Sequence, residues 1–287
     1  MAAAGPLILD FDGSVLPLPG EGRLRLADWQ ERLRYGCTPA TLDRLESLLP
    51  PAQAAGSTTF LGSGDYHHVS ERLIHRQAAA CPGLQVVVFD NHPDNMRYPF
   101  GIHCGSWVWH VGRLPAVACV HVVGIASTDV EAAHAWENRL GVLRSGRVRY
   151  WCIGRKLDWT GLLGIRGCTS WPSATAMLAA FAAHIDGTDG PIYLSIDKDV
   201  LAPGEVRTNW DQGVMTLAQL EAAVGHLRPR VVGSDITGEV SAYRYRGWLK
   251  RLLSRLDGQS APADDQLLQW QEAHRAVNLR LLRCLQS

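Results

Sequence analysis

The sequence predicts an α/β fold, a three-layer sandwich around a mostly parallel, eight-stranded sheet. Three observations indicate this class. Short runs rich in Val and Ile recur along the chain, these runs are apolar throughout, and segments with helical spacing separate several of them. Continuous apolarity is typical of strands buried on both faces of a parallel sheet. Alternation of strands with helices is typical of domains in which helices cover both faces of that sheet.

The eight candidate strands end near Gly, Asp or Ser residues that can turn the chain. They cover residues 7–11, 58–62, 85–90, 107–111, 119–125, 148–154, 192–197 and 231–236. No internal repeat or low-complexity tract is present, so a single domain over residues 1–287 is expected.

Helices are expected between these strands. Thr38 and Pro39 can begin one, and a capping box of Thr216 and Gln219 can begin another. The expected helical segments are 40–49, 70–80, 174–185, 220–227 and, after a short linker at 258–265, 267–285.

The charge and cysteine content argue against several functional classes. Lys and Arg together number 28, as do Asp and Glu, so the neutral chain has no overall electrostatic reason to bind nucleic acid or an anionic membrane. The seven cysteines are scattered without a Cys-x-x-Cys pair, which favours reduced thiols. No apolar run reaches the roughly 20 residues of a membrane helix, and the N-terminus lacks the basic start of a signal peptide. We therefore expect a soluble, cytoplasmic protein that binds a small-molecule substrate.

Acidic and histidine residues follow four of the expected strands. The stretches are Asp65-Tyr66-His67-His68, Asp90-Asn91-His92-Pro93-Asp94, Asp197-Lys198-Asp199, and Asp235-Ile236-Thr237-Gly238-Glu239. Ligands of parallel α/β sheets bind beyond the carboxyl ends of the strands, so these side chains are expected to lie together.

Such a gathering of side chains predicts a metal centre. Converging carboxylates repel one another unless cations lie among them. Carboxylate oxygen together with imidazole nitrogen suits Mn, Fe, Zn or Ni, whereas Ca and Mg prefer oxygen alone. In extended chain, alternate side chains share one face, which brings Asp197 and Asp199 together and turns Lys198 away. Five or six ligands are too many for one ion, and two ions about 3.5–4 Å apart fit the number.

These motifs resemble those of the arginase/agmatinase (ureohydrolase) family. That family has Gly-Gly-Asp-His, then Asp-Ala-His-x-Asp, then Ser-x-Asp-x-Asp-x-Leu-x-Pro, each after a strand. This chain has GSGDYHH at 62–68, FDNHPD at 89–94 and SIDKDVLAP at 195–203, in the same order. The resemblance covers most of the chain, from Leu61 to Glu239, and implies an eight-stranded parallel sheet, a pair of divalent ions that is usually Mn²⁺, and an assembly that is often a trimer or hexamer.

The resemblance also implies residue roles. Asp90 and Asp197 would bridge the two ions. Asp94 with a His from 67 or 68 would complete one site, and His92 with Asp199 the other. His103 matches a family His that helps proton transfer, and Glu239 matches a family Glu that pairs with the substrate guanidinium.

This chain departs from the family pattern at several positions. Its His motif has one extra residue, so His67 or His68 can be the ligand; His67 is favoured because that register keeps Val69, Leu73 and Ile74 on apolar positions of the next helix. Asn91 and Pro93 replace the usual Ala and Thr or Ser, and the Glu239 motif also has one extra residue. The arginase loop for an α-carboxylate is not recognisable at 95–101.

The expected activity is therefore metal-dependent hydrolysis of a C–N bond in a guanidino or amidino compound, releasing urea or a similar small amide. Trp210, shortly after Asp199, is expected to line the substrate pocket. An amide hydrolase or deacetylase of the same fold is an alternative. A phosphatase of the haloacid-dehalogenase type, with Asp10 of LILDFDGSV as nucleophile, is a weaker one, because it leaves the carboxylates and imidazoles of the later strands without a purpose.

Overall fold

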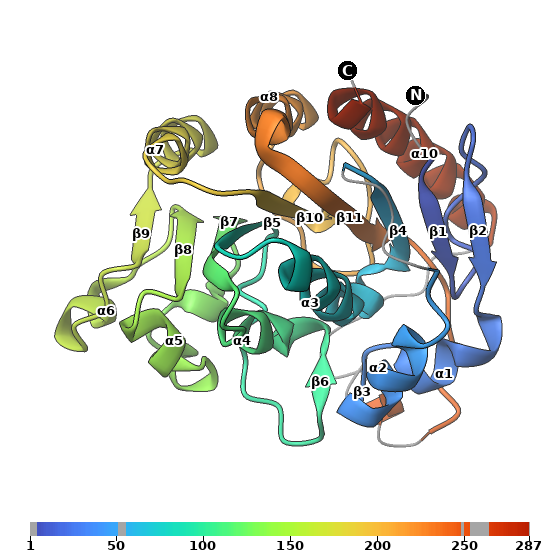
Figure 1. Ribbon diagram of the computed structural model, residues 1–287, viewed down its shortest axis with the longest axis horizontal. Coiled ribbons are helices and arrows are strands. Elements are labelled where there is room, and N and C mark those ends of the chain that lie inside the picture. The colour runs from blue at the N-terminus through green and yellow to red at the C-terminus, as the bar shows by residue number, and fades with distance from the viewer. Residues whose placement is uncertain (1–4, 51–55, 248–249, 253–263, 287) are drawn as a thin grey trace.

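A nine-stranded sheet crosses the middle of the computed structural model, which describes residues 5–50, 56–247, 250–252 and 264–286 (Figure 1). Every pair of neighbouring strands in it is parallel. The order across the sheet is β2 (Gly22–Arg25), β1 (Leu7–Asp10), β4 (Thr58–Ser63), β11 (Val231–Glu239), β10 (Ile192–Asp197), β5 (Leu84–Phe89), β7 (Val117–Ile125), β8 (Val148–Ile153) and β9 (Cys168–Trp171). Two short strands, β3 (Gly36–Cys37) and β6 (Ile102–His103), pair antiparallel beside it.

The sheet separates two hydrophobic cores. Because successive side chains of a strand point to opposite faces, Val86 and Val88 of β5 pack in one core and Val87 and Phe89 in the other. The first core is covered by helices such as α3 (Ser70–Ala80) and α4 (Trp107–Gly112). The second is covered by α7 (Ala174–Asp186), α8 (Leu217–Leu227) and α10 (Asp264–Gln286), which lie together along the top of Figure 1. The expected three-layer architecture is confirmed.

The other α-helices that the structure describes from end to end are short. They are α1 (Gln30–Leu33), α2 (Pro39–Glu46), α5 (Leu140–Arg144) and α6 (Asp158–Leu162). No helix in the described ranges is both long enough and apolar enough to cross a bilayer.

The capping box before α8 forms as expected. The Thr216 hydroxyl accepts a hydrogen bond from the Gln219 amide at 3.2 Å, and the Gln219 side chain accepts one from the Thr216 amide at 2.9 Å. Reciprocal satisfaction of these donors fixes the start of the helix. The expected final helix is α10, which begins at Asp264; residues 258–263 of the expected linker lie outside the described residues.

One expected strand is a helix. Residues 107–111 form most of α4, where Trp107, Val108 and Val111 are buried and Trp109 and His110 are only partly covered. This is helical spacing, which five consecutive apolar or aromatic residues do not distinguish from a strand. The sheet still exceeds the expected eight strands because β2 and β9 join its two edges.

The parallel arrangement brings several loops to one edge of the sheet. β4, β5, β7 and β10 all end there, and each is followed by polar residues. Every side chain expected from the sequence to bind metal ends or follows one of these strands.

Candidate functional site

A cavity of about 410 Å³ opens at the carboxyl ends of the strands. Its walls come from segments far apart in the chain. The lining includes all six side chains of the expected metal set, together with His103 and Trp210: His67, Asp90, His92, Asp94, His103, Asp197, Asp199 and Trp210. His68 and Glu239 are not among the lining residues.

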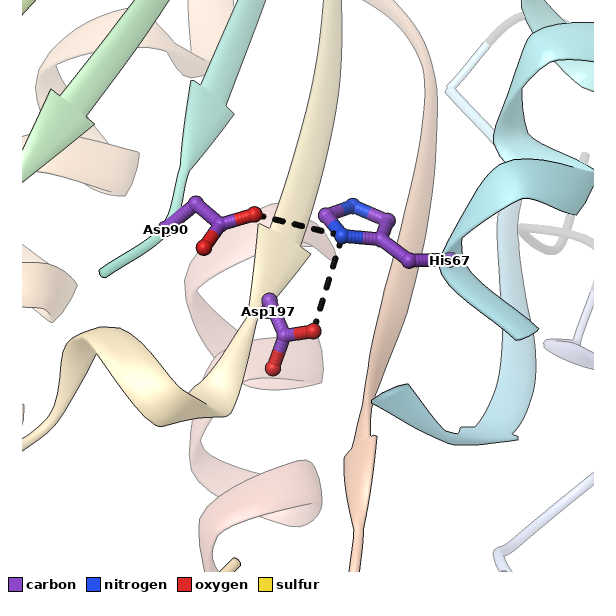
Figure 2. A group of neighbouring side chains, drawn as sticks. All are labelled: His67, Asp90 and Asp197. Atoms are coloured by element: carbon purple, nitrogen blue, oxygen red, sulfur yellow. Dashed lines mark ion pairs between the residues drawn. The ribbon is translucent and has the colours of Figure 1, made fainter. Parts of the chain in front are cut away.

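His67 lies at the centre of one group of carboxylates (Figure 2). It belongs to the 3-10 helix η2 (Gly64–Val69), which follows β4 directly and begins with the Ser63 hydroxyl accepting a hydrogen bond from the Asp65 amide. Its Nδ1 is 3.2 Å from Asp90 Oδ2, 3.0 Å from Asp94 Oδ2 and 3.5 Å from Asp197 Oδ2. Carboxylates at the ends of β5 and β10 therefore meet at one nitrogen atom of His67, which itself follows β4.

His68 points elsewhere. Its side chain is fully buried, and neither ring nitrogen has a hydrogen-bond partner among the described residues. Burial lowers the pKa of His68 well below its usual value, so the ring is neutral. Of the two histidines that the sequence left open, the geometry brings only His67 to the carboxylates.

A second group forms around His92. Its Nδ1 is 2.9 Å from Asp199 Oδ2 and 3.5 Å from Asp90 Oδ1. Asp90 therefore faces His67 with one carboxylate oxygen and His92 with the other, so it lies between the two groups. This is the placement that a carboxylate bridging two ions requires.

The two groups fit divalent cations. Within each, one ligand atom from every member lies within 4.8 Å of the others: His67, Asp90 and Asp197 in the first, and Asp90, His92 and Asp199 in the second. Asp90 Oδ2 is buried and accepts no hydrogen bond from the described residues. Transition metals are bound by such sets of carboxylate oxygens and imidazole nitrogens.

Electrostatics at this edge favour positive charge. Burial raises the pKa of Asp94 to about 7, and repulsion from Asp90 adds to it; the same two causes raise the pKa of Asp199 to about 7. Although burial opposes it, the nearby carboxylates of Asp90 and Asp94 raise the pKa of His67 well above its usual value. Here carboxylates resist ionisation, and the imidazoles beside them retain protons. A cation bound between them would stabilise the ionised carboxylates.

The backbone of β11 closes the floor of the site. A Cβ placed on Gly238 would lie 2.4 Å from Asp197 Oδ1 and 2.7 Å from the Lys198 amide nitrogen. Gly238 also has φ of +85°, which side-chain-bearing residues rarely adopt. Position 238 is thus compatible with this arrangement only as glycine.

Glu239 lies below the floor and not in the cavity. Its Oε1 accepts hydrogen bonds from Lys198 Nζ at 2.5 Å and from Asn278 Nδ2 at 2.7 Å, and Glu239 and Lys198 are both buried. Lys198 turns away from Asp197 and Asp199 as expected, although residues 198–200 form a 3-10 helix, η6 (Lys198–Val200), and not the extended chain on which that expectation rested. The buried partner that Lys198 meets is Glu239. The expected contact between Glu239 and a substrate is not available in this arrangement.

His103 lines the cavity from β6, and its ring lies among aromatic side chains. The ring centroid of Tyr98 is 4.1 Å away and that of Tyr35 is 5.6 Å away. His103 Nδ1 accepts a hydrogen bond from the Gly105 amide at 2.8 Å. Burial lowers the pKa of His103 to about 3, so near neutral pH the ring is uncharged with its proton on Nε2.

Several lining residues were not expected from the sequence. These are Tyr35, Gly64, Pro93, Met96, Cys104, Gly105, Asp129, His134, Glu137 and Asp211. Asp211 is the most prominent, because its Oδ1 is 2.6 Å from His92 Nε2. Its place directly after Trp210 was the one available signal, since Trp210 itself was expected in the pocket.

The residues of the phosphatase alternative lie outside this cavity. Asp12 forms an ion pair with the buried Arg34 at 3.3 Å, and Asp10 forms one with Arg23 at 3.1 Å. Neither Asp10 nor Asp12 is among the cavity's lining residues.

The chain is similar in sequence to one known protein and in fold to solved structures. The chain is 30% identical over 210 residues to an uncharacterized protein of Thermotoga maritima, a match that covers 73% of this chain and 68% of the relative. No protein-family model matches the sequence.

Two solved structures share the fold. Proclavaminate amidino hydrolase from Streptomyces clavuligerus is similar with a TM-score of 0.50 and 23% identity, over 82% of this chain and 70% of that one. Arginase from Bacillus subtilis is similar with a TM-score of 0.52 and 13% identity, over 86% and 77%.

Proposed function

Since the chain belongs to the same family as the Thermotoga maritima protein and has the fold of arginase and proclavaminate amidino hydrolase, we propose that it is a binuclear-metal hydrolase cleaving a C–N bond of a guanidino or amidino compound. The observation that carries this proposal is the position of Asp90, whose two oxygens face His67 and His92 separately. The products are urea, or a similar small amide, and an amine.

The proposed ligand set divides between two ions. His67 and Asp94 would hold one ion, and His92 and Asp199 would hold the other. Asp90, which belongs to both groups, would bind both ions, and the family resemblance implies the same role for Asp197, which lies in the first group. Mn²⁺ is the proposed metal because the ureohydrolase family, which the motifs resemble, usually has it, and the mixture of carboxylate oxygen with imidazole nitrogen suits Mn²⁺ as it does Fe, Zn or Ni. When bound, such a pair lowers the pKa of water toward neutrality and so supplies a nucleophile.

The remaining cavity residues act on the substrate. Asp129, Glu137 and Asp211 add carboxylates to the lining, and the described lining residues include no Lys or Arg. A cavity lined by one sign of charge attracts the opposite sign, which supports a cationic substrate such as a guanidinium or amidinium. Trp210 forms part of the wall, and neutral His103 can donate a hydrogen bond from Nε2 to the substrate or the leaving amine.

One observation favours a second candidate, an amide hydrolase or deacetylase of the same fold. Glu239, the residue expected to pair with a guanidinium, is bound to Lys198 beneath the site. An amide substrate needs no such partner. The two candidates share the metal centre and differ in the compound that is cleaved.

Metal analysis and a product screen test the proposal. Purified protein loaded with Mn²⁺ and desalted is expected to retain close to two ions per chain, whereas Asp90→Ala is expected to lose them because it removes the shared ligand. Urea release is then measured with arginine, agmatine, guanidinobutyrate, guanidinoacetate and guanidine, and acetate release with acetylated amines. Chelation is expected to abolish turnover, and Mn²⁺ to restore it.

Two outcomes would contradict the proposal. If the wild-type protein binds no transition metal, or if Asp90→Ala binds as much as wild type, the binuclear site is wrong. Acetate release in the absence of urea release would replace the guanidino hydrolase with the second candidate.

A further inference from the structure

Asp211 contacts the side of His92 that faces away from the carboxylate groups. Its Oδ1 is 2.6 Å from His92 Nε2, while His92 Nδ1 faces Asp199 and Asp90. A carboxylate only accepts hydrogen bonds, so Nε2 is the donor and carries a proton. Asp199 Oδ2, 2.9 Å from Nδ1, accepts from that nitrogen in the same way. An ion held by Nδ1 and Asp199 would replace the Nδ1 proton and leave Nε2 as the donor to Asp211.

Asp211 is held in place by Asn91. The Asn91 side-chain amide donates to Asp211 Oδ2 and to the Asp211 backbone carbonyl, both at 3.1 Å. The Asn91 backbone amide donates to Asp199 Oδ1 at 3.0 Å. One buried residue therefore connects Asp211 with Asp199, and it occupies a position where the ureohydrolase pattern has Ala.

The backbone also fixes the loop that carries Asp211. The Gly213 amide donates to the Asp199 carbonyl at 2.7 Å, and the Ala202 amide donates to the Met215 carbonyl at 2.8 Å. Both ends of the loop are thus tied to the chain that supplies Asp199. Asp211 is part of a defined arrangement even though its side chain is 69% exposed.

His67 is oriented in a different way. Its Nε2 lies 3.0 Å from Ser195 Oγ, which donates to Asp235 Oδ1 at 2.7 Å. Ser195 and Asp235 are both fully buried, so water does not compete for these hydrogen bonds. Of the two imidazoles, His67 is supported by the interior and His92 by an exposed carboxylate.

We infer that Asp211, anchored by Asn91, is the positioning residue that fixes the tautomer and orientation of His92, and that the ion on the His92 side is the more readily lost of the two. The inference rests on the proposed binuclear site. Outer partners of ligating histidines set the tautomer and raise the basicity of the ligand, and their loss weakens metal affinity about 10- to 100-fold.

Metal titration tests this inference without measuring turnover. Metal-free protein is titrated with Mn²⁺ by calorimetry, and with Co²⁺ followed by absorption and electron paramagnetic resonance. Wild type is expected to bind a tight and a weaker ion, with magnetic coupling once both Co²⁺ ions are present. Asp211→Ala is expected to keep the tight ion unchanged, to bind the second about 10- to 100-fold more weakly, and to lack the coupled signal at stoichiometric Co²⁺.

Further variants separate positioning from a general structural effect. Asp211→Asn keeps an acceptor oxygen for His92 Nε2 and is expected to recover part of the lost affinity. Asn91→Ala removes the anchor and is expected to weaken the second ion in the same direction as Asp211→Ala. Asp186→Ala is the matched control, because Asp186 pairs with His226 Nε2 at 2.8 Å on the surface, outside the cavity lining. It is expected to bind both ions like wild type.

The outcomes distinguish this inference from the proposed function. If wild type binds two ions and Asp211→Ala binds both with unchanged affinity, or loses both, Asp211 does not act selectively on His92 and the inference is wrong while the metal centre stands. If wild type binds no ion, the proposed function fails, and this inference fails with it.

Discussion

Adjacent histidines have opposite environments in this protein. His67 is surrounded by carboxylates, whereas His68, one residue later, is buried without a hydrogen-bond partner among the described residues. Burying a polar group without a partner costs free energy, while an imidazole among carboxylates gains from them. The two side chains should therefore respond differently to substitution.

His67→Ala is expected to reduce the metal content from close to two ions per chain to one or fewer. His68→Leu is expected to leave the metal content unchanged and to leave the free energy of unfolding unchanged or higher, because it removes an unsatisfied buried group worth about 1–3 kcal/mol. Elemental analysis and urea unfolding measure these quantities. Metal loss in His68→Leu with retention in His67→Ala would reverse the assignment.

The choice between these histidines was partly readable from the sequence. The register argument for His67 expected Val69, Leu73 and Ile74 at apolar positions of the following helix. Val69 and Ile74 are fully buried, whereas Leu73 is only partly buried, and Val69 ends η2 before α3 begins. The pairing of Glu239 with Lys198, in place of the expected contact with a substrate, could not be predicted from the sequence. Its partner Lys198 belongs to the residue type least often buried, and nothing local indicates that α10 would bring Asn278 to the same place.

At the scale of secondary-structure elements, a buried ion pair and its hydrogen-bond partner connect a 3-10 helix, a strand and an α-helix. Lys198 lies in the 3-10 helix η6 (Lys198–Val200), Glu239 ends β11, and Asn278 is on α10, where it also accepts from Lys198 Nζ at 2.9 Å. Because η6 contains Asp199 and directly follows Asp197, the pair holds the segment that carries two proposed ligands. Its loss should affect both stability and the site.

Lys198→Met is expected to lower the free energy of unfolding by about 3–5 kcal/mol, because it leaves the Glu239 carboxylate buried without its cation. The double variant Lys198→Met/Glu239→Met is expected to regain most of that loss, since it buries no charge. Urea unfolding of wild type, both single variants and the double variant measures the coupling. Additive single-variant losses would show that the pair contributes no interaction energy.

Which elements could be predicted depends on their burial. β4, β5, β7 and β10 are flanked by strands on both sides, so their sequences are largely apolar without strict alternation, and the polar residues at their ends were recognisable. β2, with the sequence GRLR, is partly or fully exposed at the sheet edge, and it has no apolar run. Asp211 contacts His92 across 119 residues of sequence, a distance over which no local pattern carries information.

The whole molecule contains neutral histidines away from the metal site. Burial lowers the pKa of His121 to about 3, with His184 and Arg149 nearby, and burial lowers the pKa of His274 to about 4. Both lie well below the unfolded value of about 6.5. Between these limits the unfolded chain binds protons that the native protein does not, so stability falls as the pH decreases from about 7 toward 4.

His121→Gln is expected to reduce this pH dependence. The neutral variant lacks one proton-binding group of the unfolded chain, so the stability difference between pH 7 and pH 5 should shrink by up to about 2 kcal/mol. Urea unfolding of wild type and variant at both pH values measures it. Parallel losses in the two proteins would show that His121 does not contribute.

The close approach of Gly238 to Asp197 means that the floor and the walls of the candidate site can accept sequence changes to different degrees. At Gly238, the main chain of the floor lies against the proposed ligand Asp197, so a side chain has no room there. The walls are the segments after β5, β7 and β10, which carry Met96, Asp129, His134, Glu137 and Trp210. Homologues with a different substrate should therefore have acquired it through changes in these wall segments, over an unchanged floor.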